Sequence, residues 1–179
     1  LLAVLAAGIY GSLLARRSGL DFVGVFSIAF ITALGGGTLR DVLLGRRPLF
    51  WIEHDQYPVI VFGLALASMV VRRWPPKLEA WLHLPDALGL GLFSIVGAGY
   101  ALESGTSFFV ASMFGVMTGT FGGVIGDVVR NEIPSLFRTE TPLYATCSFA
   151  GCWTYMLLST RVDETLALWI GITLVVGMR

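Results

Sequence analysis

The sequence predicts an all-α integral membrane protein with seven transmembrane helices, built as two inverted three-helix repeats plus a seventh helix. Three observations predict this class. Of the 179 residues, 55% are hydrophobic and only 13% are charged, whereas soluble domains carry about 25% charged residues. The charged residues cluster between apolar runs, as expected of segments that cross lipid. The second half of the chain also repeats the first, with a glycine-rich motif in each half.

Seven apolar runs are candidates for membrane spans. Most of them lie near the short end of the length that a spanning helix needs, about 20 residues. The first run ends at Arg16 and Arg17, and the third must end before Pro75 and Pro76, which cannot continue a helix. The predicted spans are residues 1–15, 22 to the first glycine motif, 58–74, 86–100, 108 to the second glycine motif, 142–159 and 165–179.

A shift of 86 residues (127 − 41) aligns the two halves of the chain without a gap, so that Asp41 meets Asp127 and Thr32 meets Thr118. The other matched pairs are Gly11 with Gly97, Ser18-Gly19 with Ser104-Gly105, Phe22 with Phe108, Gly36-Gly37 with Gly122-Gly123, and Pro48 with Pro134. Chance does not readily place both motifs, both turns and the proline in one register. The halves are therefore predicted to be an internal repeat.

Each repeat contains three spans, an odd number, so the second copy must enter the membrane upside down. The predicted divisions are 1–84 for the first repeat, 85–161 for the inverted repeat and 162–179 for the seventh helix. Five basic residues lie at the ends of the first and third spans or in the links that follow them, whereas the links after the fourth and sixth spans carry only Arg161. The five are Arg16, Arg17, Arg72, Arg73 and Lys77. Because basic residues favour the cytoplasmic side, we expect the N-terminus outside and the C-terminus in the cytoplasm.

Both glycine motifs fall where a helix should still be crossing the bilayer. The first contains Gly35, Gly36 and Gly37, and the second contains Gly122 and Gly123. Continuing a helix costs about 1 kcal/mol per glycine relative to alanine, so we expect the second and fifth helices to break or kink there. A break would turn the negative, C-terminal carbonyl end of a half-helix toward the motif and favour a cation. The alternative is that the glycines only permit close helix packing.

Two aspartates follow the glycines, Asp41 and Asp127. A carboxylate at membrane depth costs a few kcal/mol and is a candidate functional residue for that reason. Structural roles are equally open: the stretch from Thr38 to Asp41 matches a capping box, Arg40 can act as a counter-ion, and Arg130 lies one turn after Asp127. Contact with a solute and a structural role therefore both remain open for the two aspartates.

Hydroxyl side chains at membrane depth either line a pathway or donate to the backbone of their own helix. These residues are Thr32, Ser94, Thr118 and Thr120. Interruptions at corresponding places in two inverted repeats are typical of a solute pathway near the membrane midplane. The candidate pathway residues are Thr32, Gly35, Gly36, Gly37, Thr38, Asp41, Ser94, Thr118, Gly122, Gly123 and Asp127, with Arg40 and Arg130 as structural or gating charges.

Other classes of function have little support. Twelve basic and twelve acidic residues cancel, and without a basic patch there is no case for nucleic acid. Neither histidine, His54 or His83, is accompanied by a cysteine or carboxylate cluster of the kind that binds a metal. The sequence shows no nucleophile–base pair, so we expect no enzyme activity and no cofactor.

The motifs resemble those of the prokaryotic trimeric intracellular cation (TRIC) channel family, which overlaps the small membrane proteins described as glycine transporters. Gly35-Gly36-Gly37-Thr38-Leu39-Arg40-Asp41 matches the first family motif. Gly122-Gly123, Asp127 and Asn131-Glu132-Ile133-Pro134 match the second. Gly126 departs from the family pattern, which has an arginine there, and puts in doubt any symmetric role for two arginines. Arg130 is a candidate to compensate.

The resemblance implies a homotrimer in the inner (plasma) membrane, with a pore for potassium in each subunit lined by the second and fifth helices. Kinking at the two glycine motifs would then open or close the pore. The alternative is an alternating-access transporter for a small zwitterion such as glycine, with the two motifs as gates. Inverted repeats are common in carriers, whereas the resemblance favours a channel, so the sequence leaves both open.

Overall fold

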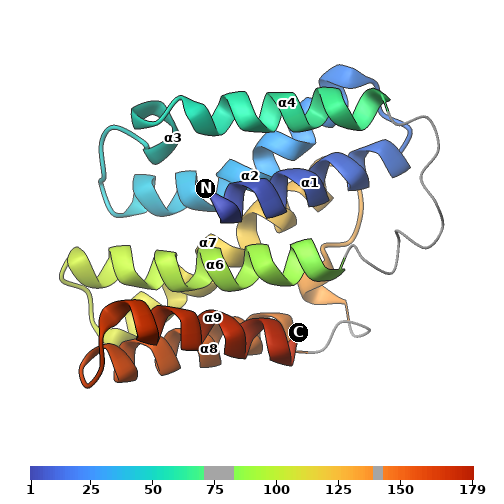
Figure 1. The fold of residues 1–179 in the computed structure, drawn as a ribbon. Coiled ribbons are helices and arrows are strands. Elements are labelled where there is room, and N and C mark those ends of the chain that lie inside the picture. Colours follow the sequence, from blue (N-terminus) through green and yellow to red (C-terminus); the bar gives the residue numbers. More distant parts are fainter. Residues whose placement is uncertain (71–82, 139–142) are drawn as a thin grey trace.

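The computed structural model describes residues 1–70, 83–138 and 143–179, and its regular elements there are all helical (Figure 1). Seven long helices in these ranges correspond to the seven predicted spans, with ends that differ by a few residues. Two short helical segments follow α2 and α7. In order, the elements are α1 (Leu2–Arg17), α2 (Phe22–Leu43), α3 (Phe50–Glu53), α4 (Gln56–Val70), α6 (His83–Glu103), α7 (Phe108–Val129), the 3-10 helix η1 (Ser135–Phe137), α8 (Tyr144–Ser159) and α9 (Glu164–Met178). The predicted end of the third span, residues 71–74, and the start of the sixth, residue 142, lie outside the described residues.

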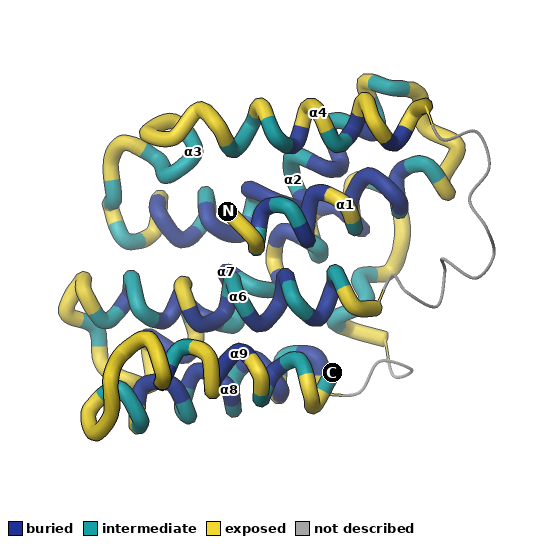
Figure 2. The backbone as a smooth tube through the Cα atoms, viewed as in Figure 1, coloured by how far each residue is buried: buried dark blue, intermediate teal, exposed yellow. Residues whose placement is uncertain are grey.

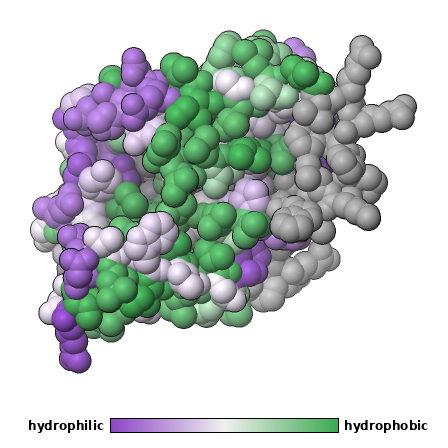
Figure 3. Space-filling model, in the orientation of Figure 1, coloured by the Kyte–Doolittle hydropathy of each residue, from purple (hydrophilic) through white to green (hydrophobic). Residues whose placement is uncertain are grey.

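The long helices lie roughly alongside one another (Figure 1). Helix α4 lies on one side of α1, and both α6 and the α8–α9 pair lie on the other side. Buried residues gather where α1, α2, α6 and α7 face each other, while α4 turns many exposed residues outward (Figure 2). Figure 3 shows hydrophobic side chains covering most of the visible face, with hydrophilic ones at one edge. By length and composition, α2, α6 and α7 are each able to cross a membrane, and α4 and α9 are apolar but shorter.

The expected break in the second and fifth helices is wrong. Both α2 and α7 are continuous helices of 22 residues that run through their glycines, and 22 residues span about 33 Å. In lipid a broken backbone has no water to bond, so keeping the hydrogen bonds within the helix outweighs the low propensity of glycine. Since neither helix ends at the glycines, no half-helix terminus supplies negative charge there. Asp41 lies in the last turn of α2 rather than at the start of a resumed helix.

Several turns adopt the same geometry in both halves at positions 86 residues apart. Asp21 and Ser107 each cap the helix that follows, accepting a backbone hydrogen bond at 2.9 Å and 3.4 Å. Gly19 and Gly105 both have positive φ, 71° and 79°, which glycine adopts without steric cost. Positive φ recurs after the ends of α2 and α7, at Gly45 (68°) and Asn131 (58°). These pairs follow the register of the internal repeat.

Candidate functional site

The central glycines of the two motifs form the crossing of α2 and α7. A Cβ atom built on Gly36 would collide with the carbonyl oxygen of Thr118, and one built on Gly122 would collide with the carbonyl oxygen of Thr32. The 86-residue shift exchanges these two contacts, because Gly36 matches Gly122 and Thr32 matches Thr118. Small residues allow membrane helices to approach this closely. These two glycines therefore bring α2 and α7 into close contact, at two points related by the 86-residue shift.

A second pair of glycines packs on the same two threonines. A Cβ on Gly11 of α1 would lie 2.9 Å from the Cβ of Thr32, and one on Gly97 of α6 would lie 2.5 Å from Oγ1 of Thr118. The Thr118 hydroxyl donates to the Phe114 carbonyl oxygen at 2.7 Å, within its own helix. The matched glycines at 11 and 97 were visible in the sequence register, but their contact partners were not.

The remaining motif glycines have different surroundings. A Cβ on Gly35 would make ordinary contacts, with the nearest atom at 3.6 Å, whereas one on Gly37 would lie 2.6 Å from the ring of Phe50. A Cβ on Gly123 would meet no atom within 4 Å. Gly123 is thus the motif glycine that faces open space.

Two predicted hydroxyl residues take part in packing between elements. Thr38 donates to the Leu34 carbonyl oxygen at 2.7 Å and accepts the indole N–H of Trp51 at 3.0 Å. Its side chain therefore ties α3 to α2 and does not cap a helix start, so the capping-box interpretation is wrong. Ser94 is fully buried and accepts from the hydroxyl of Ser148 on α8 at 2.6 Å.

Asp41 is buried and all of its described contacts are structural. Its Oδ1 accepts from Nε and Nη2 of Arg40 at 2.9 Å and 2.7 Å, and the side chains are only 2% and 3% exposed. Its Oδ2 accepts from the backbone N–H of Phe50 at 2.9 Å. Phe50 is the first residue of α3, so Asp41 joins the end of α2 to the start of the next helical segment.

Asp127 makes the same kind of connection at the end of α7. Its Oδ1 accepts from Nη2 of Arg130, and its Oδ2 accepts from the backbone N–H of Ser135 at 2.9 Å, where η1 begins. Arg130 thus pairs with Asp127 as Arg40 pairs with Asp41, although it follows the aspartate instead of preceding it. A Cβ built on Gly126, where the expected motif has arginine, would lie 2.8 Å from Oγ1 of Thr32.

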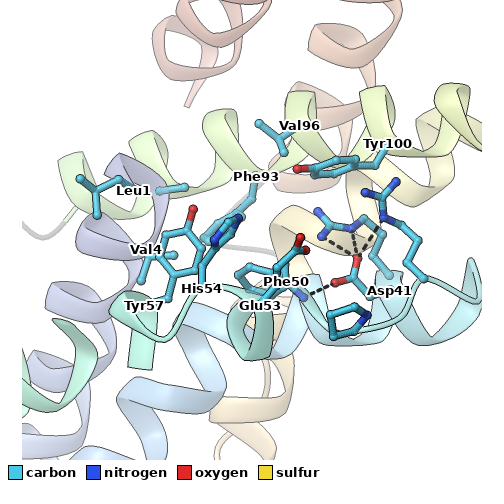
Figure 4. A pocket seen from close by; sticks show the side chains of 14 residues that line it. Leu1, Val4, Asp41, Phe50, Glu53, His54, Tyr57, Phe93, Val96 and Tyr100 are labelled. Atoms are coloured by element: carbon cyan, nitrogen blue, oxygen red, sulfur yellow. Dashed lines mark hydrogen bonds and ion pairs between the residues drawn. The ribbon is translucent and has the colours of Figure 1, made fainter. Parts of the chain in front are cut away.

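A cavity of about 160 Å³ opens beside the Arg40–Asp41 pair, and we call it the Tyr100 cavity. Val96 and Tyr100 reach it from α6, opposite Asp41 and Phe50 (Figure 4). The guanidinium carbon of Arg40 lies 4.4 Å from the Tyr100 ring centroid, a cation–π distance. The other lining residues are Leu1, Ala3, Val4, Arg40, Arg46, Pro48, Glu53, His54, Tyr57 and Phe93.

A second, smaller cavity of about 20 Å³ lies near the start of α6, and we call it the Asp86 cavity. Its charged lining residue is Asp86, whose Oδ1 accepts from the Tyr144 hydroxyl at 2.7 Å and whose Oδ2 accepts from Arg179 at 3.1 Å. Thr32 and Gly123 also line this cavity. The remaining lining residues are Ala7, Tyr10, Pro85, Gly89, Leu90, Phe93, Gly119 and Tyr144.

The structure therefore divides the predicted pathway residues into separate groups. Arg40 and Asp41 line the Tyr100 cavity, and Thr32 and Gly123 line the Asp86 cavity. The other predicted residues lie at helix contacts or in connections between segments. Sequence reasoning missed Asp86, whose signal was a carboxylate at the start of an apolar run, and Phe93, which carries no local signal. Within the described ranges no cluster of three metal-ligating side chains occurs.

The Asp86–Tyr144 contact joins α6 to α8 and has a testable energy. Replacing Tyr144 with phenylalanine removes a hydrogen bond to a carboxylate, and we expect a loss of about 1.5–3 kcal/mol in unfolding free energy. Tyr155→Phe is the matched control, because that hydroxyl bonds the exposed Glu164 at 3.1 Å and should contribute less. Denaturant unfolding in detergent measures both losses. Equal losses would show that the buried Asp86–Tyr144 hydrogen bond contributes no more to stability than the hydrogen bond to the exposed Glu164.

Comparison with known proteins gives a family match and close relatives. A family model described as Glycine transporter matches residues 1–73 and 83–160. A UPF0126 membrane protein of Vibrio cholerae is 42% identical over 166 residues, covering 90% of this chain and 68% of that protein. The UPF0126 inner membrane protein YadS of Escherichia coli (strain K12) is 38% identical over 144 residues, covering 80% of this chain and 69% of that protein.

Solved structures of TRIC channels have a very similar fold. The TRIC trimeric intracellular cation channel orthologue from Rhodobacter sphaeroides superposes with a TM-score of 0.91 at 31% identity, covering 99% of this chain and 91% of that one. A second TRIC channel structure, from work on the structural basis for conductance through TRIC cation channels, gives a TM-score of 0.89 at 32% identity. The match covers 99% of this chain and 87% of that one. The similarity thus extends over nearly the whole chain.

Proposed function

The chain belongs to the family described as Glycine transporter, and from its similarity to solved channel structures we propose that it is a channel for monovalent cations, with potassium as the main permeant ion. The observation that supports this most strongly is the similarity to TRIC cation channels, at a TM-score of 0.91 over 99% of the chain.

The proposed assembly is a homotrimer in which each subunit carries its own pore. The chain is a multi-pass membrane protein, and its relative in Escherichia coli is named an inner membrane protein, so we place it in the inner (plasma) membrane. With the N-terminus outside, the Tyr100 cavity, which Leu1 lines, opens outward. The Asp86 cavity, beside Arg179 at the other end of the bundle, then opens toward the cytoplasm.

The pathway is proposed to follow the interface between the two repeats, divided at residue 84. Thr32 and Gly123 line it, while the paired charges Arg40–Asp41 and Arg130–Asp127 hold the ends of α2 and α7. Bending of these helices at their glycines is the proposed opening motion, supported by the low helix propensity of glycine. No cofactor is part of the proposal.

The alternative is a carrier for a small zwitterion such as glycine, and the description of the matching family favours it. In that case the two cavities would be alternating vestibules. Transport would then saturate with glycine concentration, and no unitary current would flow.

One reconstitution separates the two functions. Purified protein is placed in a planar bilayer with a potassium gradient, and the same preparation is assayed for glycine uptake in liposomes. We expect discrete current steps that reverse near the potassium equilibrium potential, with no saturable glycine uptake. Saturable uptake without current steps would contradict the channel and support the carrier.

A further inference from the structure

The two cavities lie along the same faces of α6 and α1. On α6 the lining residues recur in steps of three or four positions, at Asp86, Gly89 or its neighbour Leu90, Phe93, Val96 and Tyr100. Residues with this spacing share one face of a helix. On α1 the lining residues Val4, Ala7 and Tyr10 follow the same rule. The cavities are therefore successive parts of one route between these helices.

Phe93 is the residue that lines both cavities. It is partly buried and packs on the apolar cluster that contains Val4, Ala7 and Leu34. Figure 4 shows its side chain projecting from α6 at the end of the Tyr100 cavity nearest Val4. Its ring thus stands between the two cavities, at the point where the route is interrupted.

The internal repeat shows that this ring is an asymmetric feature. Position 93 matches position 7 (93 − 86), and there the first repeat has alanine. Ala7 also lines the Asp86 cavity, so the two matched positions face the same route with very different volumes. The repeat architecture does not itself require a large side chain at this depth.

We propose that the Phe93 side chain is the hydrophobic constriction of the ion path and sets the unitary conductance; this rests on the proposed channel function. An apolar ring that stands between two cavities impedes ions because the space beside it loses its water. The polar candidates are less suited to this place. Asp41 and Asp127 are held by arginines and backbone N–H groups, and the Thr118 hydroxyl is bonded within α7.

The test is a size series at position 93, recorded as single channels in planar bilayers. We expect the conductance to fall in the order Ala, Leu, Phe, Trp, with Phe93→Ala about twofold or more above the wild type, since widening an apolar constriction lets it hydrate. Phe93→Ser adds a polar lining at reduced volume and should also conduct more. The control is Phe109→Ala, which removes an aromatic ring from α7 that is 59% exposed; its conductance should equal that of the wild type.

The outcomes distinguish the constriction from the channel itself. Each variant is first checked for its assembled size by chromatography. If the wild type conducts and the Phe93 variants match the Phe109→Ala control, the constriction is overturned and the channel stands. Currents that appear only in Phe93→Ala and Phe93→Ser support both. If correctly assembled protein never conducts, in the wild type or in any Phe93 variant, both are overturned.

Discussion

Asp41→Asn is expected to destabilise the protein by about 3–5 kcal/mol, because it leaves the buried guanidinium of Arg40 without its counter-charge. The two side chains are 3% and 2% exposed, so water is a poor substitute for the lost carboxylate charge. The substitution also weakens the acceptor for the backbone N–H of Phe50 at the start of α3. Denaturant unfolding of the detergent-solubilised protein measures the loss.

The matched control is Glu132→Gln, which breaks the Arg138–Glu132 ion pair at 3.1 Å. The side chains of Arg138 and Glu132 are 44% and 49% exposed, and such surface ion pairs contribute about 0–1 kcal/mol to the unfolding free energy. A large difference between the two variants supports a structural role for Asp41. If Asp41→Asn keeps full stability and changes ion selectivity instead, Asp41 acts on the permeating ion and the structural assignment is wrong.

Gly122→Ala is expected to lower stability through overpacking, which costs about 1–3 kcal/mol or more. The added methyl group would collide with the backbone oxygen of Thr32, and a backbone atom cannot move aside as the end of a side chain can. Gly36→Ala should act in the same way against the oxygen of Thr118. Thermal unfolding, followed by the loss of assembled protein on chromatography, measures the effect.

The neighbouring residue provides the control. An added Cβ at Gly123 meets no atom within 4 Å, so Gly123→Ala should be neutral or gain up to about 1 kcal/mol from helix propensity. Equal stability of Gly122→Ala and Gly123→Ala would show that α2 and α7 are not held by close contact at Gly122.

Much of the fold followed from the distribution of apolar and charged residues. The predicted starts at residues 22 and 108 agree with the starts of α2 and α7, because Asp21 and Ser107 cap both helices. The resemblance drawn from the glycine motifs is confirmed by the matching family model and by the similar structures. Local chemistry was sufficient for these predictions.

The failures came from effects that only tertiary structure decides. A glycine triplet has low helix propensity, but close contact between α2 and α7 and the absence of water keep both helices continuous. The sequence register matched Thr32 with Thr118, yet each threonine packs against the opposite repeat's central glycine. Phe93 was one apolar residue among many, and only its place between two cavities distinguishes it.

Cations are proposed to cross each subunit through the Tyr100 and Asp86 cavities. The direct measurement is the potassium current of Val96→Cys and Gly123→Cys channels before and after a cationic methanethiosulfonate reagent is added, with labelling quantified by mass spectrometry. Gly63→Cys, at an exposed position on α4, is the control, and the native thiols Cys147 and Cys152 are buried. We expect modification at positions 96 and 123 to reduce the unitary current and the control to keep it. Complete labelling at both positions with unchanged current would contradict the claim.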